Sequence, residues 1–193
     1  MKSICVYCGS ASQASRQYFL AAQRMGEILA GRGLTLIYGG GRTGLMGAVA
    51  DSALAGGGQV IGVITEGMNT PALAHTRLTR LEVTATIHQR KARMYALADG
   101  YLALPGGYGT LDELFETLTW AQIGEHHKPV GLLNVDGYYD PLLEMLDRAV
   151  TEKFLFPEHR LSLLCATQPE KLLDLMESHL YPLEAARRWM KQE

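Results

Sequence analysis

The sequence LTLIYGGGRTGLMGAVADSALAGGGQVIGVI, residues 34–64, contains the pattern that decides the fold. A short apolar run, Leu34–Tyr38, is followed by a glycine cluster and then by small and apolar residues up to about Ala55. Gly56–Gly58 interrupt that segment, and Val60–Ile64 is a second short run rich in β-branched residues. Glycine clusters mark turns, and apolar runs of this length are typical of buried strands. The stretch therefore predicts a strand, a helix and a second strand.

The same alternation continues on both sides of this stretch. Further strands are expected at Ile4–Tyr7, Tyr101–Leu104 and Val130–Val135. Helices are expected after Ser12 or Ser15, at about Thr86–Ala98, from the turn Pro105–Gly109 to about Gln122, at Asp140–Thr151 and at Pro169–Leu180. The stretch Met68–Thr79 is expected to be irregular. Strands that alternate with helices require crossover connections, which give a parallel sheet with helices on both faces. We therefore predict one doubly wound, Rossmann-like α/β domain over residues 1–193, with a helical tail at about 181–193.

Composition and charge exclude several classes of protein. With 193 residues, of which 47% are hydrophobic and 20% charged, the chain can form one well-buried core. The formal net charge of -2 disfavours nucleic acid as a partner. No apolar run approaches the roughly 20 residues that cross a bilayer, so no membrane association is expected. Three cysteines imply no disulfide framework, which favours a cytoplasmic location.

The first glycine cluster, Gly39-Gly-Gly-Arg-Thr-Gly44, satisfies the pattern G-x-G-x-x-G between an expected strand and an expected helix. Backbone amides and the helix dipole could meet a phosphate there. The cluster follows the second strand rather than the first, and Glu66 is far from the position of a ribose-binding carboxylate, so NAD is disfavoured. A tight turn without a ligand is the structural alternative. A phosphate or ribose contact is the preferred interpretation.

The second cluster, Pro105-Gly-Gly-Tyr-Gly-Thr110, also joins a strand to a helix. No Gly-Lys-Ser/Thr follows, so it is not a Walker A loop, and a monophosphate held by amides and the Thr110 hydroxyl is the better fit. Thr110–Glu113 has the spacing of a capping box, which would give Glu113 a structural role. The alternative is that Glu113 lies beside a ligand bound at the loop.

Arg90 falls inside a stripe of apolar residues at helical spacing. A charge on the buried side of a helix needs an internal ion pair, a route to solvent or a ligand pocket. Its neighbour Lys91 is either solvated or a second phosphate contact. No metal site is predicted, because Cys5 and Cys8 fit a strand end better than a zinc site and His126–His127 fits a surface or capping feature.

Three motifs together resemble those of the Lonely Guy (LOG) family: Tyr38-Gly-Gly-Gly-Arg-Thr-Gly-Leu-Met-Gly47, His88-Gln-Arg-Lys91 and Pro105-Gly-Gly-Tyr-Gly-Thr-Leu-Asp-Glu113. The likeness runs from Cys5-Val-Tyr-Cys-Gly-Ser10 to about Arg160. These proteins are cytokinin-activating phosphoribohydrolases that have often been labelled lysine decarboxylases. The resemblance implies hydrolysis of the N-glycosidic bond of an adenosine 5'-monophosphate, N6-substituted or not, to free base and ribose 5-phosphate, without a cofactor.

The resemblance also implies roles for single residues. Arg90 and Glu113 are expected to be catalytic, since a carboxylate can stabilise the oxocarbenium character of the transition state and orient a water. The expected substrate-binding residues are Gly9, Ser10, Gly40, Gly41, Met46, Lys91, Gly106, Gly107, Tyr108, Gly109, Thr110, Asp112 and Thr119. Many relatives carry an acidic residue where this chain has Ala72, so the base preference between AMP and a cytokinin nucleotide stays open. A homodimer with sites near its interface is also implied.

Two alternatives belong to other classes of protein. A non-catalytic nucleotide or cofactor carrier or sensor would resemble the molybdenum-cofactor carriers that share the glycine loops, but it would have little use for Arg90 and Glu113. A pyridoxal-phosphate decarboxylase would need a lysine that forms a Schiff base, and Lys91 next to Arg90 is a poor candidate.

Overall fold

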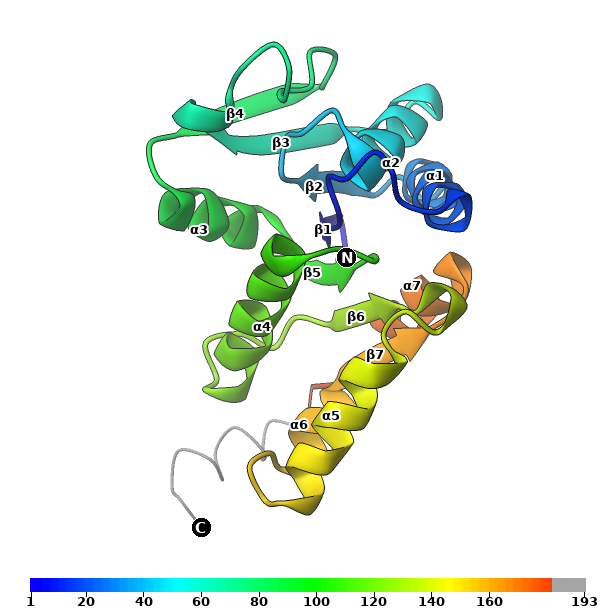
Figure 1. Cartoon of the computed structure of the whole chain (residues 1–193), viewed down its shortest axis with the longest axis vertical. Coiled ribbons are helices and arrows are strands. Elements are labelled where there is room, and N and C mark those ends of the chain that lie inside the picture. Colours follow the sequence, from blue (N-terminus) through cyan, green and yellow to red (C-terminus); the bar gives the residue numbers. More distant parts are fainter. Residues whose placement is uncertain (182–193) are drawn as a thin grey trace.

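The computed structural model describes residues 1–181, and its centre is one sheet of seven parallel strands in the order β4-β3-β2-β1-β5-β6-β7 (Figure 1). The strands are β1 (Ser3–Tyr7), β2 (Thr35–Tyr38), β3 (Val60–Thr65), β4 (Arg80–Thr84), β5 (Gly100–Ala103), β6 (Val130–Leu133) and β7 (Leu163–Ala166). The chain adds strands outward from β1 in one direction and then returns to place β5 on the other side of β1. The topological switch point, where open α/β sheets bind ligands, therefore lies between β1 and β5.

Helices cover both faces of the sheet, as predicted. They are α1 (Arg16–Gly31), α2 (Gly44–Ala55), α3 (Ile87–Leu97), α4 (Tyr108–Gln122), α5 (Asp140–Thr151), α6 (Pro157–Ser162) and α7 (Pro169–Glu177), with short 3-10 turns η1 (Glu66–Met68) and η2 (Val135–Gly137). Met25 of α1, Val49 of α2 and Leu172 of α7 belong to one apolar cluster. Met94 of α3 and Leu114 of α4 belong to the other. Figure 1 shows the two groups of helices on opposite sides of the strands.

The structure corrects the prediction at three elements. Strand β4 was not predicted, because its residues Arg80–Thr84 alternate charged and apolar side chains and stay half exposed at the sheet edge. The short helix α6 and the strand β7 after it were also missed, since no glycine or proline separates them. The strand predicted at Val130–Val135 ends at Leu133, and the last described helix ends at Glu177 rather than Leu180.

Two further points concern the limits of the described chain. The predicted helical tail lies, apart from its first residue, in 182–193 and so outside the described residues. Among residues 1–181, every helix is too short or too polar to traverse a lipid bilayer.

Candidate active site

Three loops meet at the switch point, and Gly9 connects them. It follows β1, and its N–H donates to Pro105 O (3.0 Å) in the loop after β5. Its carbonyl accepts from Leu45 N (2.9 Å), at the start of α2. A Cβ atom added at Gly9 would lie 3.3 Å from Gly106 Cα, closer than most Cβ contacts, so the two loops pack tightly at this glycine. The two glycine clusters predicted to bind the ligand are therefore joined through the β1 loop.

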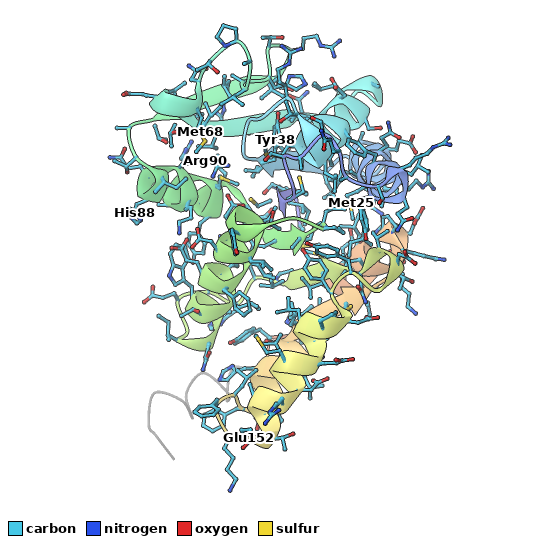
Figure 2. All side chains as sticks on the ribbon, in the orientation of Figure 1. Met25, Tyr38, Met68, His88, Arg90 and Glu152 are labelled. Carbon is cyan, nitrogen blue, oxygen red and sulfur yellow. The ribbon has the colours of Figure 1, made fainter. Side chains whose placement is uncertain are left out.

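Arg90 and Glu113 form a buried ion pair beside these loops. Arg90 Nη1 donates to Glu113 Oε1 at 2.9 Å, and only 10% and 11% of the two side chains are exposed. Arg90 Nε also donates to Val63 O (2.8 Å), which fixes the guanidinium between α3 and the sheet (Figure 2). A side chain at Gly39 would overlap Arg90 Nη2, so the first glycine cluster makes room for this arginine. The buried position predicted for Arg90 is confirmed.

The carboxyl group of Glu113 experiences two opposing influences. Burial raises its pKa, because a low-dielectric surrounding disfavours the charged form, while the charge and hydrogen bond of Arg90 lower it. Burial dominates, and the pKa lies above its ordinary value. Such a carboxylate is a stronger base than an exposed glutamate, yet Arg90 keeps its orientation fixed.

The capping-box interpretation of Thr110–Glu113 is wrong. Helix α4 begins at Tyr108 with Gly107 as its N-cap residue, so Thr110 lies inside the helix. Its side chain is buried against the loop, where a side chain on Gly106 would overlap the Thr110 hydroxyl. Glu113 is therefore not held by a capping bond and projects from the second turn of α4 toward Arg90.

The two glycine clusters differ in their free donors. At α2, the amides of Leu45 and Met46 donate to Gly9 O, and Arg42 N donates to Leu73 O (2.9 Å). Thr43 N and Gly44 N have no acceptor among residues 1–181, but Gly44 is buried. At α4, the exposed amides of residues 107–109 have no acceptor among residues 1–181. Helix N-termini with free amides bind anions. The second cluster is therefore the better anion site, and a contact of Gly40, Gly41 or Met46 with the rest of a ligand stays a prediction.

Lys91 lies next to the ion pair but has partners of its own. Its Nζ contacts Asp112 Oδ2 at 3.1 Å and Glu116 Oε1 at 3.0 Å, and 11% of its side chain is exposed. The interpretation of Lys91 as a solvated neighbour is wrong, because its side chain is largely covered and its ammonium group contacts two carboxylates of α4. Asp112 is mostly exposed, so Lys91 can exchange it for a phosphate oxygen.

A cavity of about 320 Å³ opens beside the loop that joins β5 to α4, residues 104–107, here called the α4 loop. It is lined by Gly9, Ser10, Ala11, Ala14, Tyr18, Leu45, Pro105, Gly106, Gly107 and Tyr138. The rings of Tyr18 and Tyr138 meet edge to face at 5.7 Å on its wall. Sequence reasoning missed both tyrosines. The one available signal was the position of Tyr138 just after a strand, at the edge of the sheet where ligands bind.

Thr119, the two N-terminal cysteines and His126 are the remaining residues that the sequence singles out. Thr119 donates to Phe115 O (2.7 Å) and lines a separate cavity of about 130 Å³ between α4, α5 and α6. Cys5 and Cys8 are buried, as predicted, and burial raises the pKa of the Cys5 thiol. The surface interpretation is wrong for His126, because Tyr95 and Tyr101 pack against its ring and its Nε2 contacts Thr117 O at 3.0 Å.

Comparison with known proteins gives concordant matches. The family model described as "Possible lysine decarboxylase" matches residues 46–176. A cytokinin riboside 5'-monophosphate phosphoribohydrolase of Oryza sativa subsp. japonica is 44% identical over 99% of this chain and 79% of its own length. One of Arabidopsis thaliana is 46% identical over 92% of this chain and 82% of its own length.

Solved structures match as well. The molybdenum cofactor binding protein of Rippkaea orientalis has a TM-score of 0.69 and 26% identity, covering 91% of this chain and 95% of that one. The molybdenum cofactor carrier protein of Chlamydomonas reinhardtii has a TM-score of 0.66 over the same shares, at 20% identity, and shows the fold alone.

Proposed function

The chain belongs to the LOG family of cytokinin riboside 5'-monophosphate phosphoribohydrolases, which the "Possible lysine decarboxylase" model describes, and we propose that Arg90 and Glu113 perform its reaction. The substrate is a nucleoside 5'-monophosphate with an adenine base, and the reaction is hydrolysis of its N-glycosidic bond. The observation that carries the proposal is the buried Arg90–Glu113 pair of 2.9 Å, one helical turn from the free amides of α4.

In this reaction the bond between the anomeric carbon and the base nitrogen breaks, and its electron pair leaves with the base. A water adds its oxygen to the anomeric carbon, and the proton it loses is balanced by the proton taken up by the base. The carboxylate of Glu113 stabilises the developing oxocarbenium ion and accepts the proton of the water, which passes on through solvent to the departing base and leaves Glu113 ionised again. Arg90 orients that carboxylate through the bond to Nη1. The products are free base and ribose 5-phosphate.

The phosphate would lie at the N-terminus of α4. Residues 107–109 supply amides, Lys91 supplies a charge after it leaves Asp112, and the helix dipole adds partial positive charge. The ribose would then extend toward Glu113, since it is the next part of the substrate. Gly9 and Ser10, which line the cavity beside the loop, would flank the nucleotide.

The residues do not fit pyridoxal phosphate. A Schiff-base lysine must be a neutral nucleophile. Burial opposes protonation of Lys91, but its bonds to Glu116 and Asp112 outweigh this and raise its pKa. The carrier alternative draws on the fold shared with molybdenum cofactor binding proteins, but it leaves the Arg90–Glu113 pair without a use.

We further propose a homodimer in the cytoplasm. Three free cysteines, two of them buried, suit a reducing compartment. The position of Thr119 supports the dimer, because its cavity is separate from the Arg90–Glu113 site within one chain. If Thr119 contacts substrate, it must do so in the site of a second copy.

The test is release of base from AMP and isopentenyladenosine monophosphate, followed by chromatography. Glu113→Gln should lower kcat about 100- to 10,000-fold, because the amide can neither carry charge nor accept the proton. Glu82→Gln is the matched control, since Glu82 of β4 also pairs with an arginine of α3, but with Arg93 instead of Arg90. An active Glu113→Gln variant would contradict the assignment, and binding of AMP without release by the wild type would favour the carrier.

A further inference from the structure

Two tyrosine hydroxyls donate hydrogen bonds to main-chain carbonyls of the α4 loop. The Tyr139 hydroxyl donates to Leu104 O at 2.7 Å. The Tyr138 hydroxyl donates to Gly106 O at 2.6 Å. Both tyrosines follow β6, so residues more than 30 positions away in sequence fix the carbonyls of this loop. Neither residue takes part in the chemistry proposed for Arg90 and Glu113.

The other two carbonyls of the loop are also engaged. Pro105 O accepts from Gly9 N (3.0 Å), and Gly107 O accepts from Leu111 N (3.1 Å) in the first turn of α4. Four successive carbonyls, residues 104–107, therefore each have a donor within the protein. The amides of residues 107–109 have none among residues 1–181.

Because the carbonyls of the loop are occupied and its amides are free, the loop can bind an anion. In a planar trans peptide the C=O and the following N–H point in opposite directions. The bond from Tyr138 to Gly106 O therefore turns the N–H of Gly107 away from Tyr138. Gly106–Gly107 is the most flexible pair of residues that a chain can contain, and an unrestrained peptide could present its carbonyl to the ligand instead. A carbonyl oxygen that faces a phosphate would repel it, because both carry negative charge.

The tyrosines are themselves held by the turn that carries them. Asn134 Oδ1 accepts from Tyr139 N (2.7 Å), and Asn134 Nδ2 donates to Asp140 Oδ1 (2.7 Å). Asp136 has φ of 52°, a conformation that few residues other than glycine adopt, and Gln17 Nε2 donates to its carboxylate at 2.7 Å. Hydrogen bonds therefore hold the segment 134–140 in place, and its two tyrosines contact the α4 loop.

We propose that Tyr138 and Tyr139 are positioning residues that set the peptide orientation of the phosphate-binding loop. The inference rests on the proposed function, which places the phosphate of the substrate at the α4 N-terminus. The hydroxyls bind carbonyls on one side of the loop, and the amides that bind the phosphate face the other. Loss of either hydroxyl weakens the binding of phosphorylated ligands and leaves the chemistry at Glu113 intact.

The experiment measures binding of ribose 5-phosphate by calorimetry and hydrolysis of AMP, for the wild type, Tyr138→Phe and Tyr139→Phe. We expect the Kd of ribose 5-phosphate and the KM of AMP to rise about 3- to 10-fold, the effect of one lost hydrogen bond, with kcat within about 2-fold. The Kd of adenosine, which has no phosphate, should not change in the same calorimetric measurement. General damage to the fold would alter kcat, the KM of AMP and the Kd of adenosine together.

Tyr101→Phe is the matched control. Tyr101 is as buried as Tyr139, and its hydroxyl also donates to a main-chain carbonyl, Tyr95 O at 3.1 Å, but away from the loop. If Tyr139→Phe does not fold, Tyr138→Phe decides, because Tyr138 is 41% exposed and its substitution is less disruptive. The proposal is overturned if ribose 5-phosphate binds both variants as tightly as the wild type, if Tyr101→Phe weakens binding equally, or if the wild type does not bind it. Binding by the wild type without hydrolysis of AMP contradicts only the proposed function, and the values of Kd still decide the role of the tyrosines.

Discussion

At the scale of single residues, the pKa of Glu113 links the structure to the pH dependence of the reaction. Burial raises this pKa above its ordinary value of 4.5, and Arg90 partly offsets the increase. Because the carboxylate is the active form, activity is present above this pKa and is lost as the pH falls through it. The acid limb of kcat/KM, which reports on the free enzyme, should therefore lie above pH 4.5.

Arg90→Gln sharpens this prediction. Removing the guanidinium takes away the charge that lowers the pKa of Glu113, so the acid limb should move to higher pH, in addition to a loss of kcat. Arg93→Gln is the control, because Arg93 belongs to the same helix and pairs with Glu82 instead. The measurement is a pH profile of kcat/KM with AMP. An acid limb at or below pH 4.5 in the wild type, or one that does not move in Arg90→Gln, would show that Glu113 does not titrate as described.

At the scale of elements, the sequence predicts what depends on local pattern and misses what depends on distant contacts. The βα alternation, both glycine turns and the inward position of Arg90 follow from runs and spacing within a few residues. The start of α4 at Tyr108 was missed because Thr110 fits a cap equally well in sequence, and only its packing on Gly106 decides. The bond from Tyr138 to Gly106 joins residues 32 positions apart, which no local pattern reveals.

Gly39 tests how one turn positions a side chain from another element. Any side chain there would overlap Arg90 Nη2, and Arg90 has little freedom to retreat because Val63 O and Glu113 hold it. Gly39→Ala should therefore lower kcat about 100-fold or more, as expected when a catalytic group is displaced by about 1 Å. Gly31→Ala, at the end of α1 with no atom near the new methyl group, should keep full activity and raise stability by about 0.4–1 kcal/mol. Equal activity of both variants in the base-release assay would mean that Arg90 need not stay where it is.

At the scale of the whole molecule, the loops of the candidate site meet at the carboxyl ends of β1 and β5. Helix α4 begins at this site, and its other end lines a second cavity. Glu113 faces Arg90 on one side of α4, and Thr119 lines the other cavity with Leu146, His159 and Leu163. A single chain therefore cannot use both residues in one site. A symmetric dimer removes the conflict if the Thr119 side of one copy lies against the open α4 loop of the other.

Hybrid dimers test this arrangement. Glu113→Gln should be inactive, and Thr119→Ala should be impaired at substrate concentrations below KM. In a hybrid of the two, one site contains both defects, while the other combines Glu113 of one copy with Thr119 of its partner. Mixing equal amounts and allowing exchange should therefore restore activity to about one quarter of the wild type, because half of the dimers are hybrids with one intact site each. Light scattering should give twice the chain mass of 21.2 kDa for each protein. If Thr119 acts within its own chain, each intact Glu113 in the mixture still lies beside an altered Thr119, and the activity stays at the average of the two parents.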